Sequence, residues 1–248
     1  MLTSDDESGF FRMPELKTRL SALDVDALEA VLDAQGYACI SALLSAKDCA
    51  VLTRRYDDEA GFRSRVIMAR HGFGQGEYKY FDDPLPALVQ SLRAGLYPPL
   101  AAIANRWHAL LAEDERFSPY HAAYLDHCHA AGQTKPTPLL LRYGPGDHNR
   151  LHQDLYGDEV FPLQATILLS DRENDFTGGE FVVTEQRPRQ QSRVEVVPLK
   201  RGDTVIFPVR HRPVQGARGY YRATMRHGVS RLHAGSRTTL GVIFHDAK

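Results

Sequence analysis

The chain has 248 residues, of which 43% are hydrophobic and 25% are charged. This balance is ordinary for a globular protein, so a sizeable core can form in one large domain or two small ones. The net charge of -1 argues against a protein that coats nucleic acid through bulk positive charge. The three cysteines, Cys39, Cys49 and Cys128, form no CxxC pair, and we expect reduced thiols rather than a disulfide framework.

Charge is distributed unevenly along the chain. Residues 1–60 hold twelve acidic and six basic residues, whereas residues 187–237 hold twelve basic residues against only Glu195 and Asp203. A basic region of this kind favours an anionic partner or substrate near the C-terminal half, although solvated arginines on strand faces would give the same composition. Because the acidic N-terminus has no apolar signal core and no run approaches about 18 apolar residues, we expect a cytoplasmic protein without a membrane helix.

The first part of the chain is expected to be mainly helical. Residues 1–12 are polar and are expected to form a flexible leader. Apolar residues then recur at helical spacing over residues 13–32, with Asp24 as an internal N-cap. A short strand is expected at residues 37–40, and a serine caps a second helix over about residues 45–56.

The stretch 63–81 differs from its surroundings. It has an alternating arm, a turn that contains three glycines, and an aromatic arm, which together predict a hairpin or a flexible flap. Helical periodicity returns over residues 84–111, and residues 119–133 are expected to form another helix or helix end. Residues 13–135 are therefore interpreted as a helical N-terminal part that is interrupted by this hairpin.

After Pro136 the chain becomes rich in strand-forming residues separated by polar turns. The expected strands are 137–144, 162–170, 179–185, 194–199, 203–209, 220–229 and 237–245. Several short strands with polar turns favour a closed or double-sheet architecture of the jelly-roll type. Because helices come first and strands later, we predict an α+β fold, with a double-stranded β-helix (jelly-roll) core over residues 136–248 and the N-terminal helices packed against it as one compact unit.

A His-x-Asp motif at residues 152–154 is the first candidate functional feature. On a strand, residues two apart project to the same face, so His152 and Asp154 are suited to bind one metal ion. His227 lies far downstream and is the candidate for a second imidazole. Two imidazoles and one carboxylate on one side of an octahedron form the ligand set of non-haem Fe(II) oxygenases, although a His-x-Asp motif alone is more often a chance pattern.

Arg237 follows His227 by ten residues, at the start of the next apolar strand. We expect a hairpin turn through residues 233–236 to place Arg237 beside the metal strand, deeper inside the barrel. A buried guanidinium needs an anionic partner, which it can grip through two parallel hydrogen bonds, and the far carboxylate of 2-oxoglutarate would be such a partner. Tyr143, nine residues before His152, is placed equally well to donate to that carboxylate or to pack as a core aromatic residue.

The ordered combination of these features resembles the 2-oxoglutarate/Fe(II)-dependent dioxygenases. It comprises the His-x-Asp motif, the HGV run at His227, Arg237 ten residues later, and the TGGEF and KRGDTVIF segments between the ligands. The TGGEF glycines, Gly178 and Gly179, would permit close backbone approach there. The resemblance covers residues 137–247, about half of the chain.

Within that superfamily, the run LLLRYGPGDHNRLHQD (139–154) resembles the AlkB-type DNA-dealkylating oxygenases. The whole chain is similar to an AlkB-like bacterial oxygenase group linked to oxidative repair of alkylated DNA. In AlkB-type enzymes the tyrosine that matches Tyr143 touches the cosubstrate. Two features depart from that pattern: the ten-residue spacing between His227 and Arg237 is similar to prolyl hydroxylases, and Leu141 stands where AlkB has a cosubstrate-binding asparagine.

The resemblance implies hydroxylation of a substrate C–H bond by Fe(II), 2-oxoglutarate and dioxygen, with release of succinate and CO2 and with ascorbate as a supporting reductant. If the carbon is an N-methyl group, the product loses formaldehyde, which is oxidative dealkylation of a damaged DNA or RNA base. The alternatives are prolyl-hydroxylase-like hydroxylation of a protein, peptide or small molecule, a zinc hydrolase, and a non-catalytic metal-binding jelly-roll sensor. A cosubstrate clamp of Arg237 and Tyr143 disfavours the last two, since neither function needs one.

A base attacked by such an enzyme must leave its stack and enter the pocket between aromatic or planar cationic groups. The candidates in the stretch 63–81 are Phe73, Tyr78 and Tyr80, with Arg65 and Arg70 beside them; Arg187, Arg189, Arg210, Arg212 and Arg218 are further candidates for phosphate contacts. For the aromatic residues, ordinary core packing is the competing interpretation, and for each arginine it is a solvated side chain.

Overall fold

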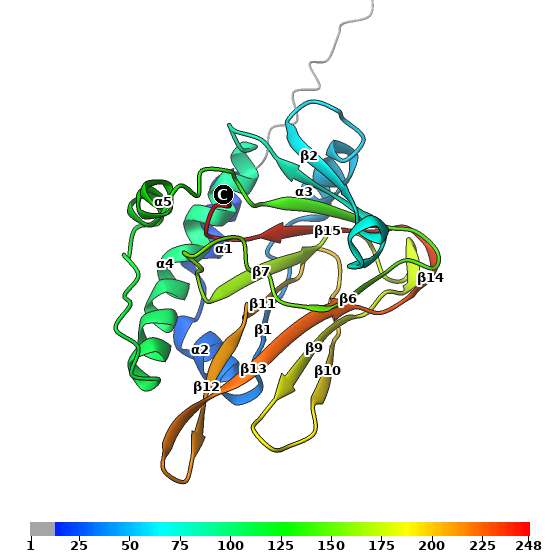
Figure 1. Cartoon of the computed structure of the whole chain (residues 1–248). Helices are drawn as coiled ribbons and strands as arrows, with labels where there is room; N and C mark the ends of the chain where they lie inside the picture. The colour runs from blue at the N-terminus through cyan, green and yellow to red at the C-terminus, as the bar shows by residue number, and fades with distance from the viewer. Residues whose placement is uncertain (1–12) are drawn as a thin grey trace, which may run out of the picture.

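The computed structural model describes residues 13–248, and the predicted leader at residues 1–12 lies outside this range. Two antiparallel β-sheets form the centre of the protein, and the helices gather on the outer face of the larger sheet (Figure 1). This arrangement confirms the prediction of an α+β fold with a jelly-roll core. No helix in residues 13–248 combines the length and the apolar character needed to cross a membrane.

The helices begin and end at signals that the sequence carries. They are α1 (Met13–Ser21), α2 (Val25–Gln35), α3 (Ala46–Arg55), α4 (Ala87–Leu110) and α5 (His121–Ala130), with a 3-10 helix, η1 (Met68–His71). The Asp24 carboxylate accepts a hydrogen bond from the Ala27 N–H, so the helix expected over residues 13–32 is divided into α1 and α2 at this cap. Ser45 and Asp48 form a capping box at the start of α3.

The large sheet has seven strands, all paired antiparallel. Their order is β1 (Ala38–Ile40), β11 (Thr204–Pro208), β7 (Leu163–Leu168), β15 (Arg237–Val242), β5 (Leu139–Tyr143), β4 (Glu77–Phe81) and β2 (Phe62–Ile67). The predicted hairpin at 63–81 is therefore present as β2 and β4, and its arms extend the large sheet rather than standing apart from it.

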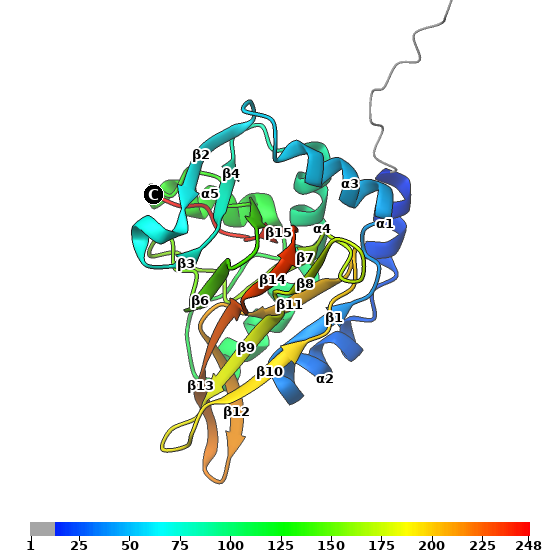
Figure 2. The same ribbon diagram turned by 90° about the vertical axis from the view of Figure 1, so that its right-hand side faces the viewer.

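The small sheet lies against the other face of the large one. Its order is β10 (Arg193–Val197), β9 (Phe181–Gln186), β13 (Gly219–Val229), β6 (His148–His152) and β3 (Gly74–Gln75), with β12 (His211–Gly216) paired to the free end of β13. A separate pair is formed by β8 (Phe176–Gly178) and β14 (Leu232–Gly235). Figure 2 shows the β9–β10 and β12–β13 hairpins projecting from one end of this sheet.

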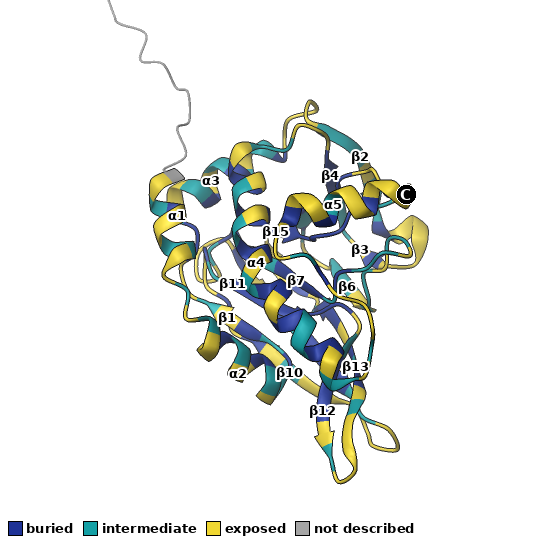
Figure 3. Cartoon of the chain, turned by 90° about the vertical axis from the view of Figure 1, so that its left-hand side faces the viewer, coloured by how far each residue is buried: buried dark blue, intermediate teal, exposed yellow. Residues whose placement is uncertain are grey.

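Two large apolar clusters hold these layers together, beside a small third cluster of Tyr80, Leu139 and Ile243. One cluster joins side chains of all five α-helices to the outer face of the large sheet, where Trp107, Tyr97 and Leu240 are fully buried. Seen from the helix side, the strands behind α4 are buried and the outer faces of the helices are exposed (Figure 3). The second cluster fills the space between the two sheets and includes Tyr143 and Phe207. The functional site lies at the edge of this second core.

Five strands, β3, β6, β8, β12 and β14, were not separately predicted from the sequence. β8 and β14 have three and four residues, and they pair only with each other among the described strands. β12 contains Pro213 and ends at Gly216, a composition typical of a turn rather than a strand. These strands form because neighbouring strands supply their hydrogen-bond partners, which is a tertiary effect that local propensity does not record.

Candidate active site

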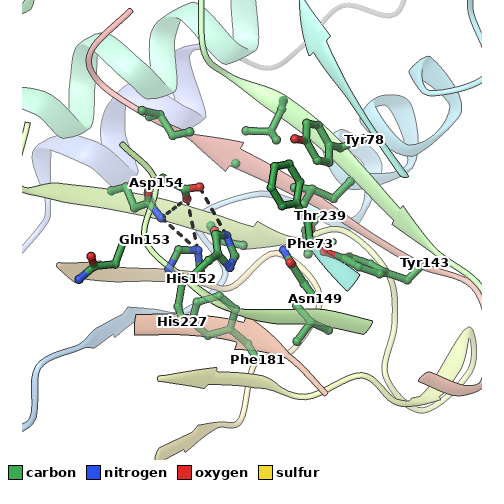
Figure 4. Close-up of a pocket in the computed structure, with 18 of the residues that line it drawn as sticks. Phe73, Tyr78, Tyr143, Asn149, His152, Gln153, Asp154, Phe181, His227 and Thr239 are labelled. Carbon is green, nitrogen blue, oxygen red and sulfur yellow. Dashed lines mark hydrogen bonds and ion pairs between the residues drawn. The ribbon is translucent and has the colours of Figure 1, made fainter. Parts of the chain in front are cut away.

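Three side chains that could hold a metal ion meet on the inner face of the small sheet. His152 ends β6, His227 lies opposite it on β13, and Asp154 follows two residues after β6. One ligand atom of each residue lies within 4.8 Å of the other two. Asp154 Oδ1 is 3.4 Å from His152 Nε2, and Asp154 Oδ2 is 3.3 Å from His227 Nε2 (Figure 4). The structure therefore brings together the three residues expected from the motif, in a donor set that fits Fe(II).

Asp154 reaches the site by a route that differs from the expectation. β6 ends at His152, so Asp154 lies on the following loop and not on a strand face. Its carboxylate is instead oriented by two hydrogen bonds from separate elements. The Tyr156 hydroxyl donates to Oδ1 at 2.8 Å, and the Gln164 amide on β7 donates to Oδ2 at 2.8 Å. Because β7 belongs to the facing sheet, the orientation of this ligand depends on the packing of the two sheets.

A β-bulge sets the direction of the side chains beside His152. His227 pairs with His152, and two residues further along β13, Val229 pairs with Asn149, three residues back on β6. β13 therefore has one residue where β6 has two, and the bulge lets both Asn149 and His152 line the pocket. Gly228 is the single residue opposite the bulge, where a Cβ would lie only 2.7 Å from the Asn149 carbonyl oxygen. The glycine of the HGV run thus permits the bulge.

Burial and the charges of the neighbouring groups shift the pKa of each of the three candidate ligands. Burial by itself raises the pKa of Asp154, but the hydrogen bonds and charges of the two imidazoles hold that pKa well below its usual value. Burial holds the pKa of His227 below its ordinary value. For His152, burial lowers the pKa, but the adjacent Asp154 raises it further, so the net shift is upward. A carboxylate and a neutral imidazole are thus available as ligands at neutral pH.

Arg237 lies across the barrel from the metal ligands. After β13 the chain forms β14 and then enters β15 of the large sheet, between β5 and β7. The predicted hairpin through residues 233–236, with Arg237 beside the metal strand, is therefore wrong, because the chain crosses between sheets at this point. Arg237 nevertheless lines the same pocket as His227.

The guanidinium of Arg237 is a buried cation with open donors. The residue is 1% exposed, and its Nε and Nη1 atoms have no hydrogen-bond partner among the described residues. Tyr143, its cross-strand neighbour on β5, has a buried hydroxyl that is likewise unpartnered within residues 13–248. Burial lowers the pKa of Arg237 to about 10 and raises that of Tyr143, so both groups stay protonated at neutral pH. Leaving such donors unpaired is costly, and a ligand carboxylate such as that of 2-oxoglutarate would satisfy them.

The glycine turn expected near the site packs against the stem of Arg237. Gly179 has φ 62°, and a Cβ there would lie 2.7 Å from Leu232 Cδ1 and 3.0 Å from Arg237 Cδ. At Gly178, with φ 74°, a Cβ would lie 2.5 Å from the Arg231 carbonyl oxygen. Both positions therefore need glycine for backbone conformation and for close approach, and together they fix the direction of the Arg237 side chain.

A cavity of about 240 Å³ connects the metal ligands to Arg237. Its walls are largely apolar, and they include Leu139, Leu141, Phe181, Val229 and Ile243. Phe73 and Leu155 also line the cavity and are 48% and 45% exposed, so they mark its mouth. Figure 4 shows Phe73 and Tyr78 on the side of the cavity opposite His227.

The substrate candidates from the 63–81 hairpin separate into two groups. Phe73 and Tyr78 line the cavity. Tyr80 is 7% exposed and packs against Tyr78 and Tyr156, outside the cavity lining. Its position is that of a core residue, so a direct substrate contact by Tyr80 does not fit this structure.

The arginine candidates also lie apart from the cavity. Arg65 forms an ion pair with Glu77 on the neighbouring strand, and Arg70 is exposed on η1; neither lines the cavity. Arg212 is 1% exposed and is bound to Glu185, so the predicted phosphate contact by Arg212 is wrong. Arg187 binds the same carboxylate, whereas Arg189, Arg210 and Arg218 are exposed.

Three residues of the site, Gln164, Tyr156 and Asn149, were not predicted from the sequence. Gln164 is a polar residue inside the apolar run PLQATILL, and that break in pattern was a usable signal. Tyr156 lies only two residues after Asp154 in the sequence. Asn149 gave no signal, because its direction depends on the bulge, and a bulge shifts the alternation on which strand-face arguments rest.

Comparison with known proteins agrees with this geometry. A family described as "Oxygenase, catalysing oxidative methylation of damaged DNA" matches residues 76–247. An uncharacterised protein of Mycobacterium tuberculosis is 48% identical over 167 residues, which are 67% of this chain and 72% of that protein.

Solved structures with a similar fold are more distant in sequence. A Pseudomonas putida prolyl-4-hydroxylase has a TM-score of 0.54 at 17% identity, covering 88% of this chain and 96% of the other. A Trichoplax adhaerens prolyl hydroxylase, in complex with a peptide fragment of a hypoxia inducible factor, has a TM-score of 0.56 at 12% identity, covering 93% and 92%. At these identities the likeness shows the fold alone, which this chain shares with the two prolyl hydroxylases. By its sequence match, with a fold and a donor set that agree, this chain belongs to the oxygenase family described as acting on damaged DNA, and it is an oxidoreductase.

Proposed function

We propose that this oxygenase uses Fe(II) and 2-oxoglutarate to hydroxylate an alkyl carbon on a damaged nucleic-acid base, which releases the alkyl group as an aldehyde. The observation that carries the proposal is that the guanidinium of Arg237 and the hydroxyl of Tyr143 have hydrogen-bond donors without a partner among the described residues. Both residues line one cavity with the candidate metal ligands His152, Asp154 and His227. The family description supports the choice of substrate, because it names damaged DNA.

Each side chain of the site has a separate task in this proposal. His152, Asp154 and His227 hold the iron, while Arg237 and Tyr143 grip the distal carboxylate of the cosubstrate and fix its direction. When both groups are bound, they supply the oxidation of a C–H bond by dioxygen, with 2-oxoglutarate converted to succinate and CO2. The chain contributes position and exclusion of water rather than a proton donor or a nucleophile.

The apolar residues at the cavity mouth support entry of a group with apolar faces. Phe73 on the hairpin turn and Leu155 after the metal loop offer apolar surface at the mouth. A base that leaves its stack needs such surfaces to replace the lost stacking. Tyr78 and Leu141 also line the cavity wall.

Hydroxylation of a peptide or small molecule is the second candidate. Among the residues that line the cavity, Asp154 is the only carboxylate, so the cavity has no free anion to pair with a cationic group. A neutral ring, such as that of proline, would therefore fit as well as a neutral alkylated base. The ten-residue spacing from His227 to Arg237, which is similar to prolyl hydroxylases, also favours this candidate.

A turnover screen separates the candidates. The full-length protein, loaded with Fe(II) and 2-oxoglutarate, is incubated with N-methylated single-stranded DNA or RNA, or with proline-containing peptides. Succinate and formaldehyde are measured together. Formaldehyde that rises with succinate only on methylated oligonucleotides supports dealkylation. Succinate without formaldehyde, accompanied by a peptide mass increase of one oxygen, would instead establish a peptide hydroxylase. An inactive His152→Ala variant controls for free iron.

A further inference from the structure

Two β-hairpins project from one end of the small sheet. The β9–β10 hairpin turns through residues 187–192, and the β12–β13 hairpin turns through residues 217–218. Figures 1 and 2 show both tips at the same end of the molecule. The last pair between β9 and β13 joins Gln186 to Thr224, so β13 runs on beyond β9 to Gly219 with β12 as its partner. We refer to these two segments, residues 181–197 and 211–229, as the paired hairpins.

The outward face of β13 carries a row of arginines. Ala223, Met225 and His227 are buried and face the core, and the alternate positions face outward. Arg222 and Arg226 are spaced by four residues on β13 and therefore share its outward face, Arg218 lies in the turn that precedes β13, and all three are exposed. At about 3.3 Å per residue, the row is about 26 Å long. It runs from the hairpin tip to the residue that precedes the metal ligand His227.

Most of these guanidiniums have no protein partner. In residues 13–248, no hydrogen bond or ion pair is made by the side chains of Arg189, Arg218 and Arg226. Arg222 binds Glu113 but remains 52% exposed. Arg193 contacts Glu195, which is partly exposed. The other acid on the paired hairpins, Glu185, is buried. The exposed surface of the paired hairpins is therefore mainly basic, and Glu195 is its one partly exposed acid.

Strand β6 continues this surface toward the mouth of the cavity. Arg150 and Leu151, at the bulge of β6, are exposed next to β13. The Arg150 side chain donates to the Gly72 carbonyl oxygen, and its backbone N–H donates to the Phe73 carbonyl oxygen. Phe73 marks the mouth, so the arginine row leads to the cavity without an intervening acidic side chain on β13 or β6.

We propose that the paired hairpins bind the phosphodiester backbone of a nucleic-acid strand whose reacting base occupies the cavity. This inference rests on the proposed function and adds to it a second contact region remote from the iron. Guanidinium groups bind phosphate through paired hydrogen bonds, and a row of like charges suits a repeating polyanion. Exposed Tyr220, beside Arg218, provides an aromatic surface for an unstacked base at the tip.

The length of the row makes the inference testable by substrate length. A stacked strand rises about 3.4 Å per nucleotide, so a row of about 26 Å corresponds to roughly eight nucleotides. A tetranucleotide that places its base in the cavity does not reach the hairpin tip. A 20-nucleotide strand does, and it should bind more tightly because it contacts the paired hairpins as well.

The test compares two charge-matched double variants of the full-length protein. Arg189→Gln with Arg218→Gln removes two unpaired charges from the hairpin tips. Lys47→Gln with Arg54→Gln removes two exposed charges from α3, at the opposite end of the molecule in Figure 2. Fluorescence anisotropy measures the affinity of each for labelled 4- and 20-nucleotide single-stranded DNA over a range of salt. The double variant at the hairpin tips should bind the 20-mer about fivefold to thirtyfold more weakly. The slope of log affinity against log salt concentration should fall by about 1.4, and the affinity for the 4-mer should not change.

Two results would overturn the inference. One is an equal loss of affinity in the α3 pair, which would indicate bulk charge. The other is an affinity for the 20-mer that the substitutions at the hairpin tips leave unchanged. This outcome would overturn the inference even if the same variant lost binding to vesicles of anionic lipid. The proposed function is tested separately, by formaldehyde release from a methylated 4-mer, which does not involve the hairpin tips. Failure of one proposal is thereby distinguished from failure of the other.

Discussion

The side-chain amide of Gln164 donates a 2.8 Å hydrogen bond to Asp154 Oδ2 from the opposite sheet. Its nitrogen also lies 3.4 Å from His227 Nε2. Gln164 is 2% exposed, and its Oε1 atom has no hydrogen-bond partner among the described residues. One buried amide therefore contacts two of the three metal-binding residues, so the geometry of the site depends on how the two sheets pack.

Replacing Gln164 by leucine should weaken metal binding without removing a ligand. The Asp154 carboxylate would lose one of its two orienting hydrogen bonds, and such losses typically reduce metal affinity about tenfold to a hundredfold. Calorimetric titration with Co(II) under anaerobic conditions measures the change. Gln153→Leu is the matched control, because the Gln153 amide donates to backbone carbonyls and not to Asp154. Equal affinity in the Gln164 variant and the wild type would contradict this role.

His152→Ala should abolish both metal binding and succinate formation. The two remaining ligands would hold divalent iron too weakly to support turnover, because the facial set of two imidazoles and one carboxylate would lack one imidazole. Metal content after dialysis and succinate yield are the measurements. His127→Ala serves as the control, since the His127 side chain is exposed on α5 and contacts Glu159. A fully active His152 variant would show that the metal lies elsewhere.

Arg237→Lys should mainly raise the apparent KM for 2-oxoglutarate, by about tenfold to a hundredfold. An ammonium group carries the charge but cannot reproduce the two parallel hydrogen bonds of a guanidinium. Steady-state kinetics with varied 2-oxoglutarate checks the prediction, and kcat should change much less. Tyr143→Phe, which removes one neutral donor, should raise KM by a smaller factor. If KM is unchanged in the lysine variant, another arginine anchors the cosubstrate.

Gly228→Ala should disturb the bulge and, with it, the position of His152. The new Cβ would lie 2.7 Å from the Asn149 carbonyl oxygen, so the backbone of β6 or β13 must shift. We expect a loss of roughly 1–3 kcal/mol in the free energy of unfolding, together with weaker metal binding. Gly144→Ala is the control, because a Cβ there meets nothing closer than 3.7 Å. Urea unfolding and Co(II) titration of both variants test the difference.

Stability should fall in mild acid because of two buried histidines. Burial lowers the pKa of both His121 and His245 to about 4, from an ordinary value of 6.5. Between these two pH values the unfolded chain binds protons that the folded protein excludes, so the free energy of unfolding decreases as pH falls from about 6.5 toward 4. The loss is up to about 3 kcal/mol for each histidine.

Urea unfolding at pH 7 and pH 5 measures this loss. A His245→Gln variant, whose side chain does not titrate in this range, should lose less stability between the two pH values than the wild type. His71→Gln, at an exposed position, should lose as much as the wild type. An identical pH dependence in the His245 variant would show that other groups cause the acid sensitivity.

The sequence determined the class of the fold and the three candidate metal ligands. Alternating short strands after Pro136 require a half-buried sheet, and the caps at Asp24 and Ser45 act locally, so both were readable from the chain. The ordered motif likewise predicted the cluster of His152, Asp154 and His227, because residue type and spacing limit which metals and geometries are suitable.

Only the tertiary structure decided how these residues are aimed. Arg237 reaches the cavity from the opposite sheet, because the chain crosses between layers after β13. Asn149 faces inward through a bulge whose existence depends on the backbone of Gly228, and Gln164 acts on Asp154 from a strand that is distant in sequence from β6 and β13. These relationships arise from the pairing and packing of distant segments, which local propensity does not encode. The same reason applies to the paired hairpins, whose arginines were visible as composition but became a surface only through strand register.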